Sequence, residues 1–241
     1  MQIILPAITG CLLIIIGIPL MNSELNDSKM EKPSYVVLQW ITLGEIIVAL
    51  FEIFFVIFRR YFTTLDGIFI ICIFLYSLYV GLIDNYTHNY YIETGLLLIV
   101  FPLAGWYYFG LKCMLFGTMA GMCICLFLVI LEYLVQRKVT LGFADILFLT
   151  LGNSLVGITH TELYWGTIAL GATLTAIFTL LDYKSKHKEI TNDTFIPILP
   201  MIGIVNCVVF FLLVLECRTR YPQMSSLCLM LCKDFLFSLN N

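Results

Sequence analysis

The sequence predicts an all-α protein, a polytopic transmembrane helical bundle of about eight spans. Of its 241 residues, 61% are hydrophobic and 12% are charged, and the mean hydropathy is +0.98. A soluble domain carries roughly a quarter charged residues. Apolar runs long enough to cross a bilayer as helices recur along the whole chain. We therefore expect the lipid bilayer as a partner. The net charge of -3, without a basic patch, predicts no nucleic-acid partner.

The apolar runs give the spans and the domain organisation. The first run lacks a basic leading region and a small-residue cleavage pattern, so we expect it to remain as an anchor. We expect an N-terminal anchor helix and short cytoplasmic loop (1–39), a membrane domain (40–215) and a C-terminal, possibly interfacial, tail (216–241). The expected spans are 3–21, 35–58, 65–83, 90–110, 113–135, 143–160, 163–182 and 195–215.

The distribution of Lys and Arg predicts the orientation in the cell membrane. With the N-terminus outside, the inner loops hold seven basic residues and the outer loops hold three. If the three basic residues of the tail also lie outside, the count becomes seven inside against six outside. An excess of basic residues in the loops favours the cytoplasmic side. In this orientation the loops at 22–34, 84–90, 136–142 and 183–194 face the cytoplasm.

The nine cysteines predict neither a disulfide framework nor a metal site. Most lie inside apolar runs, and none forms a Cys-x-x-Cys pair. Cys228 and Cys232 are four residues apart, but no histidine or further cysteine lies close to them in sequence. We expect no metal and no cofactor.

Two aspartates stand beside membrane-length apolar runs. Asp84 closes the run 68–83, and Asp145 opens the run 146–158. A carboxylate near a bilayer is costly and marks a candidate functional site. Two carboxylates on one side of the membrane can share a proton and activate a water molecule.

Each of these aspartates also has a purely structural interpretation. Asp84 can be a carboxylate at a helix end that the headgroup region solvates. Asp145 can begin a helix, where a carboxylate meets the positive end of the helix dipole. Asp66, at the start of another span, is interpreted as a boundary charge.

Three short segments contain distinctive motifs. Residues 81–94 contain Ile-Asp at the end of a span, and residues 141–152 contain Gly-Phe-Ala-Asp. Residues 196–200 read Ile-Pro-Ile-Leu-Pro and follow a basic loop at 184–188. Together these segments resemble the type IV prepilin peptidase family, whose members are membrane aspartyl proteases with a Gly-x-Gly-Asp motif. The segments occur in the family's order, and the resemblance covers roughly residues 40–215.

The resemblance implies roles for five residues. Asp84 and Asp145 would be the catalytic pair, with Gly142 and Ala144 as supporting residues of the second motif. The second glycine of the family motif is Ala144 in this chain. Glu45 matches a glutamate early in the family's second span. It would support the aspartate site, or it would be a hydrogen-bonded glutamate that ties helices together.

The function implied is that of a hydrolase, an aspartyl endopeptidase that cleaves the leader of prepilin-like or pseudopilin precursors at the cytoplasmic face. Such enzymes serve type IV pilus assembly, protein secretion and competence. The family's cysteine-rich segment, associated with methylation, is absent, since 22–34 contains no cysteine. The resemblance therefore implies a divergent peptidase without methyltransferase activity. Two alternatives stay open, namely a catalytically inactive relative that binds prepilins or assists assembly, and a small proton-coupled transporter.

Overall fold

The computed structural model describes residues 4–28, 33–58, 62–87, 95–137, 141–185 and 199–220, and every regular element in these ranges is a helix. The all-α prediction is confirmed for this part of the chain. The elements in chain order are α1 (Ile4–Asp27), α2 (Pro33–Phe58), α3 (Thr64–Thr87), η1 (Leu96–Ile99), α5 (Val100–Phe109), α6 (Leu111–Gln136), α7 (Phe143–Val156), η2 (Ile158–His160), α8 (Thr161–Ser185) and α9 (Leu199–Arg220).

Six of the described helices, α1, α2, α3, α6, α8 and α9, are long and apolar enough to cross a membrane. The other two expected spans, 90–110 and 143–160, contain the shorter helices α5 and α7. Both end at glycines with positive φ, Gly110 (84°) and Gly157 (67°). The 14 residues of α7 rise only about 21 Å, less than the ~30 Å of a bilayer core. The structure therefore supports a multi-pass protein with six candidate spans.

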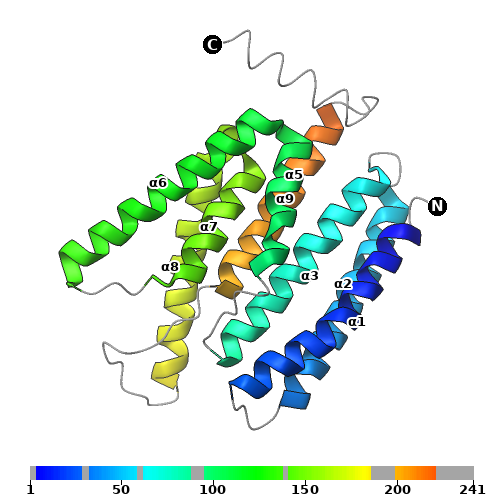
Figure 1. Ribbon diagram of the computed structural model, residues 1–241, viewed down its shortest axis with the longest axis horizontal. Coiled ribbons are helices and arrows are strands. Elements are labelled where there is room, and N and C mark those ends of the chain that lie inside the picture. Colours follow the sequence, from blue (N-terminus) through cyan, green and yellow to red (C-terminus); the bar gives the residue numbers. More distant parts are fainter. Residues whose placement is uncertain are drawn as a thin grey trace.

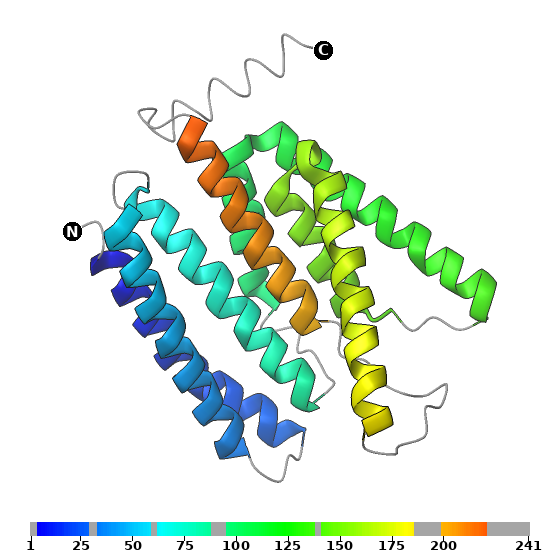
Figure 2. The same cartoon turned by 180° about the vertical axis from the view of Figure 1, so that it is seen from behind.

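Helices α3 and α9 form the centre of the bundle and lie side by side in both views (Figures 1 and 2). In each candidate span, we compare the share of residues that is buried within an apolar stretch of 18 residues. This share is 67% in α3 and 61% in α9, against 17% in α2 and 11% in α8. Helices α1 and α2 form one edge of the bundle, whereas α6 and α8 lie at the opposite edge. The central pair therefore positions the remaining helices.

Small residues bring the central helices close together. A Cβ atom at Gly203 of α9 would lie 3.2 Å from the Cβ and carbonyl oxygen of Ser77 in α3. A Cβ atom at Gly105 of α5 would overlap the carbonyl oxygen of Ser154 in α7. Close backbone approach at small residues is the usual way in which transmembrane helices gain packing energy.

Aromatic rings join α3, α5 and α7 at the level of Tyr76. The ring centroid of Tyr76 lies 6.0 Å from that of Phe148 in α7 and 6.1 Å from that of Phe101 in α5. Phe101 and Phe148 are 5.4 Å apart. Packing of this kind adds to burial, because edge-to-face and offset ring pairs attract one another.

The helix ends flanking the four loops expected in the cytoplasm lie at one end of the bundle, the lower end in Figure 1. They are the last turns of α1, α3, α6 and α8 and the first turns of α2, α7 and α9. We call this the aspartate end, because Asp84 lies in the last turn of α3 and Asp145 in the first turn of α7. The first turn of α1 and the last turn of α9 lie at the other end.

We predict that Gly105→Ala destabilises the bundle by about 2 kcal/mol or more, because overpacking against a backbone carbonyl forces α5 away from α7. Gly166→Ala in α8 is the matched control, since a Cβ atom there meets nothing within 4 Å. Thermal unfolding of both variants in detergent micelles measures the difference. Equal transition temperatures would contradict this account of the α5–α7 contact.

Candidate functional site

Asp84 is buried in the last turn of α3, with 7% of its surface exposed. This turn is held on two sides. The hydroxyl of Tyr86 donates a hydrogen bond to Oε1 of Gln39 in α2 at 2.8 Å. On the other side, a Cβ atom at Gly81 would lie 3.3 Å from Cα of Pro200 in α9. The side chain of Asp84 therefore lies inside the bundle, which argues against a carboxylate solvated at the surface.

Asp145 occupies the third position of α7 and closes a capping interaction with Gly142. The backbone N–H of Gly142 donates to Oδ2 of Asp145 at 3.0 Å. The carbonyl of Gly142 accepts from the N–H of Ile146 at 3.1 Å. Burial raises the pKa of the Asp145 carboxyl above its ordinary value, and the hydrogen bond from Gly142 opposes this shift. Asp145 therefore lies in surroundings that favour its protonated form.

Gly142 and Ala144, the two supporting positions of the second motif, differ in whether the structure requires a glycine. Gly142 has extended backbone angles (φ −71°, ψ 158°) that any residue adopts. A Cβ atom at Gly142 would, however, lie only 3.2 Å from Oδ2 of Asp145, so glycine leaves room for the carboxyl group. Ala144 lies inside the first turn of α7, and Arg137 is the one non-glycine residue with positive φ among the described residues. Position 144 therefore does not require the conformational freedom of glycine.

Asp84 and Asp145 lie at the same end of the bundle but at different depths. From the contact between Tyr76 and Phe148, Asp84 is eight residues further along α3, or about 12 Å. Asp145 is three residues before Phe148, or about 5 Å along α7 in the same direction. The two positions differ in depth by about 7 Å. Helices α5 and α9 each pack against both α3 and α7 and so link the two aspartates.

Glu45 lies elsewhere, on an exposed face near the middle of α2. Its neighbour Gly44 faces the bundle, where a Cβ atom would lie 2.9 Å from the side chain of Ile14 in α1. Helix α2 packs against α1 and α3, whereas α7 packs against α5, α6, α8 and α9. The structure thus does not bring Glu45 to Asp145, and a hydrogen bond from Glu45 to another described residue is also absent.

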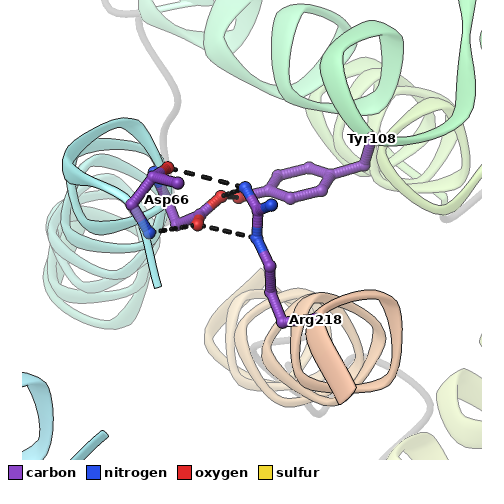
Figure 3. A network of polar contacts seen from close by, with 4 residues as sticks. Asp66, Tyr108 and Arg218 are labelled. Atoms are coloured by element: carbon purple, nitrogen blue, oxygen red, sulfur yellow. Dashed lines mark hydrogen bonds and ion pairs between the residues drawn. The ribbon is translucent and has the colours of Figure 1, made fainter. Parts of the chain in front are cut away.

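A buried ion pair crosses the opposite end of the bundle (Figure 3). Nη2 of Arg218 in α9 lies 2.7 Å from Oδ1 of Asp66 in α3, and Nε lies 2.9 Å from Oδ2. Asp66 has no exposed surface, and Arg218 is 5% exposed. The hydroxyl of Tyr108 in α5 donates to Oδ1 at 2.5 Å. One carboxylate therefore joins three helices.

Local backbone contacts complete the coordination of Asp66. The backbone N–H of Thr63 donates to Oδ2 at 2.6 Å, and the N–H of Asp66 donates to Oγ1 of Thr63 at 3.3 Å. The carboxylate thus accepts four hydrogen bonds, which uses its full acceptor capacity. A fully hydrogen-bonded pair of this kind can offset the cost of removing two charges from water.

The interpretation of Asp66 as a boundary charge was wrong. Its partner Arg218 is 152 residues away in sequence and lay in the segment expected to be a tail. Helix α9 continues through Arg220, so the first five residues of that segment belong to the helix. No local sequence pattern indicates this pairing, because the two residues are 152 positions apart.

A second buried polar group lies where α7, α8 and α9 meet. Nδ2 of Asn153 donates to the carbonyl of Gly117 at 2.6 Å and to Oγ1 of Thr161 at 3.1 Å. The hydroxyl of Tyr164 and the amide of Asn206 are fully buried, and neither forms a hydrogen bond within the described part of the chain. Buried polar atoms of this kind are normally paired, often by ordered water.

Comparison with known proteins gives no match: no family model, no curated protein and no solved structure matches the chain. The resemblance of the three motifs therefore enters the functional argument only through the residues themselves and their places in the fold. Among the described residues, no group of three or more His, Cys, Asp or Glu side chains is arranged to hold a metal ion.

We predict that Asp66→Asn destabilises the protein by about 3–5 kcal/mol, because Arg218 keeps its charge and loses its counter-ion in a buried site. Glu162→Gln, at an exposed glutamate in the first turn of α8, is the control. Unfolding of purified protein in mixed micelles measures both.

The double substitution Asp66→Leu with Arg218→Met removes both charges together. We expect it to recover most of the stability lost in Asp66→Asn, because apolar side chains of similar volume replace the pair without leaving a buried charge. A double variant as unstable as Asp66→Asn would contradict the assignment of the loss to an unpaired arginine.

Proposed function

We propose that this chain is a membrane aspartyl endopeptidase of the prepilin peptidase type, which removes the leader of prepilin-like or pseudopilin precursors at the cytoplasmic face. The observation that carries the proposal is that the helices carrying three sequence segments far apart in the chain pack together. Gly81, three residues before Asp84, packs against Pro200. Phe148, three residues after Asp145, packs against Tyr76 of α3.

The third contact joins the second segment to α9, the helix that begins within the last segment. A Cβ atom at Gly152 of α7 would lie 2.5 Å from Oδ1 of Asn206 in α9. Only the first and last segments contact each other directly, through Gly81 and Pro200. The second segment contacts Tyr76 of α3 and Asn206 of α9, so the three helices that carry the segments pack together, and two of them contribute an aspartate at the same end. Convergence of sequence motifs at one place is what a shared active site requires, so it supports the peptidase proposal.

The proposed chemistry uses the two carboxyl groups in complementary protonation states. The ionised carboxylate accepts a proton from a water molecule as the water oxygen attacks the scissile carbonyl carbon. The protonated carboxyl group donates a hydrogen bond to the carbonyl oxygen and then transfers its proton to the departing amine. Either group can hold the shared proton, because Asp84 is buried and burial raises the pKa of Asp145. The two groups would titrate as a unit.

The burial of Tyr164 and Asn206 without described partners favours a second candidate, a small proton-coupled transporter. Polar groups inside a membrane bundle are a common feature of ion pathways. The two proposals differ in a measurable way. A transporter gives pH-dependent flux in liposomes without substrate cleavage, whereas a peptidase cleaves a precursor in detergent solution, where no gradient exists.

We predict that Asp84→Asn and Asp145→Asn each abolish leader cleavage and leave membrane insertion and abundance nearly unchanged. Residues that act as one unit are non-additive, so the double variant should be no slower than either single variant. Asp27→Asn is the matched control, because Asp27 is an exposed aspartate in the last turn of α1 at the same end. Cleavage of a co-reconstituted precursor is followed by gel shift and mass spectrometry.

Near-normal cleavage by either single variant would show that the two aspartates are not the catalytic pair. If the folded wild-type protein does not cleave the precursor, the result would instead favour the alternative that the chain is a catalytically inactive relative, which binds precursors or assists assembly.

We predict that the aspartate end faces the cytoplasm of a cell, because the loops at that end hold seven Lys and Arg residues against three in the loops at the other end, before the tail is counted. In a cysteine-free background, Asn85→Cys and Arg137→Cys should react with a membrane-impermeant thiol reagent only from inside. Lys112→Cys, at the start of α6, should react only from outside. If Asn85→Cys and Arg137→Cys label from opposite sides, no shared site forms and the transporter becomes the better proposal.

A further inference from the structure

The chain that leads from α6 into α7 is held by two carboxyl groups, one from each helix. Oε2 of Glu132 in α6 accepts a hydrogen bond from the backbone N–H of Leu141 at 3.2 Å. The next N–H along the chain, that of Gly142, donates to Oδ2 of Asp145 at 3.0 Å. Glu132 and Asp145 therefore bind adjacent backbone N–H groups of one turn, which we call the α7 entry turn (141–142).

Helix packing between α6 and α7 ends before the α7 entry turn. A Cβ atom at Gly121 of α6 would lie 3.2 Å from Cα of Thr150 in α7. Closer to the turn, Sγ of Cys125 lies 3.9 Å from the carbonyl oxygen of Ile146. Beyond Cys125, most side chains of α6 are exposed up to the end of the helix. The hydrogen bond of Glu132 thus anchors the chain beyond the region where the two helices pack.

The spacing along α6 places Glu132 on the side that faces α7. Glu132 lies seven residues, or two turns, after the fully buried Cys125, so both side chains project from one face of the helix. Gly142 is the N-cap of α7, and Leu141 directly precedes it. Glu132 therefore binds the returning chain just before the N-cap and fixes where α7 begins relative to α6.

The α7 entry turn orients the carboxyl group of Asp145. The peptide plane that joins residues 141 and 142 contains the N–H of Gly142, so a restraint on Leu141 limits the direction of that N–H. Oδ2 of Asp145 is bound by this N–H, whereas Oδ1 has no hydrogen-bond partner in the described part of the chain. The arrangement thus holds one oxygen of Asp145 and leaves the other available to a water molecule.

The contact requires a side chain of the right length at position 132, rather than a charge. The distance of 3.2 Å between Oε2 and the backbone nitrogen lies at the long end for an N–H···O hydrogen bond. An aspartate is shorter by one methylene group and leaves the N–H of Leu141 without this acceptor. A glutamine has the length of a glutamate, and its amide oxygen accepts a hydrogen bond in the same way.

We propose that Glu132 is a positioning residue for Asp145, which binds the α7 entry turn and so holds the aspartate carboxyl group in one orientation. The consequence for leader cleavage rests on the proposed peptidase function. The restraint of the α7 entry turn stands whether or not the chain is a peptidase. Glu132 takes no part in the proton transfers themselves, which belong to the two aspartates.

The test compares Glu132→Gln with Glu132→Asp in the full chain, co-reconstituted in vesicles with the precursor that tests the peptidase proposal. Gln136→Ala is the matched control, because Gln136 is exposed and lies one turn further along α6. Cleavage kinetics give kcat and KM for each variant. Hydrogen exchange followed by mass spectrometry measures the protection of residues 141–148, and the exchange of α3 and α9 in the same samples reports the fold.

We expect Glu132→Asp to lower kcat about tenfold or more and to leave KM within about twofold, because a misdirected carboxyl group slows the reaction without weakening substrate binding. Hydrogen exchange of residues 141–148 should be faster in this variant, with α3 and α9 unchanged. Glu132→Gln and Gln136→Ala should match the wild-type chain in both measurements.

Three results would overturn the proposal. One is a Glu132→Asp variant with wild-type kcat, or with wild-type exchange of residues 141–148. Another is a loss of kcat in Glu132→Gln but not in Glu132→Asp, which would show that the residue acts by charge. The third is faster exchange in α3 and α9 as well, which would make the effect a general loss of stability.

The exchange measurement separates this proposal from the peptidase proposal. If the folded wild-type chain does not cleave the precursor, the peptidase proposal fails, and the exchange rates alone decide whether Glu132 holds the α7 entry turn.

Discussion

The buried ion pair between Asp66 and Arg218 is the interaction on which the central part of this bundle depends. It joins α3 to α9 at the end opposite the two motif aspartates, and the hydroxyl of Tyr108 adds α5 to the same carboxylate. A bidentate arginine–carboxylate pair fixes both distance and orientation. Because α3 and α9 run past each other with glycine contacts along their length, fixing one end also constrains the other, where Asp84 and Pro200 lie.

The cost of charge in a bilayer explains how the acidic residues are distributed. Asp66 is fully hydrogen-bonded by its partners. Asp84 and Asp145 lie in terminal turns at one end of the bundle. Glu45 and Glu52 lie on an exposed face of α2. Pairing and position at a helix end are two ways to lower the cost of a carboxyl group in a membrane protein.

Much of the fold follows from the sequence because apolar length determines transmembrane helices. The six long helices coincide with apolar runs, but α5 and α7 are shorter than expected, since Gly110 and Gly157 end them with positive φ. The contact between Asp66 and Arg218 was not predictable, because a pairing across 152 residues leaves no local pattern. Glu45 was grouped with the aspartates by motif order, whereas helix orientation turns it outward.

The proposed peptidase requires Asp84 and Asp145 to come close enough to act on one water molecule, and a cross-linking measurement tests this requirement most directly. In a cysteine-free background, cysteines replace both aspartates, and a short bifunctional thiol reagent is added to the protein in vesicles. Intact mass then reports intramolecular bridging. A pair at positions 84 and 112, at opposite ends of the bundle, is the control. The account predicts efficient bridging of the 84–145 pair alone, and bridging no greater than in the control pair would contradict it.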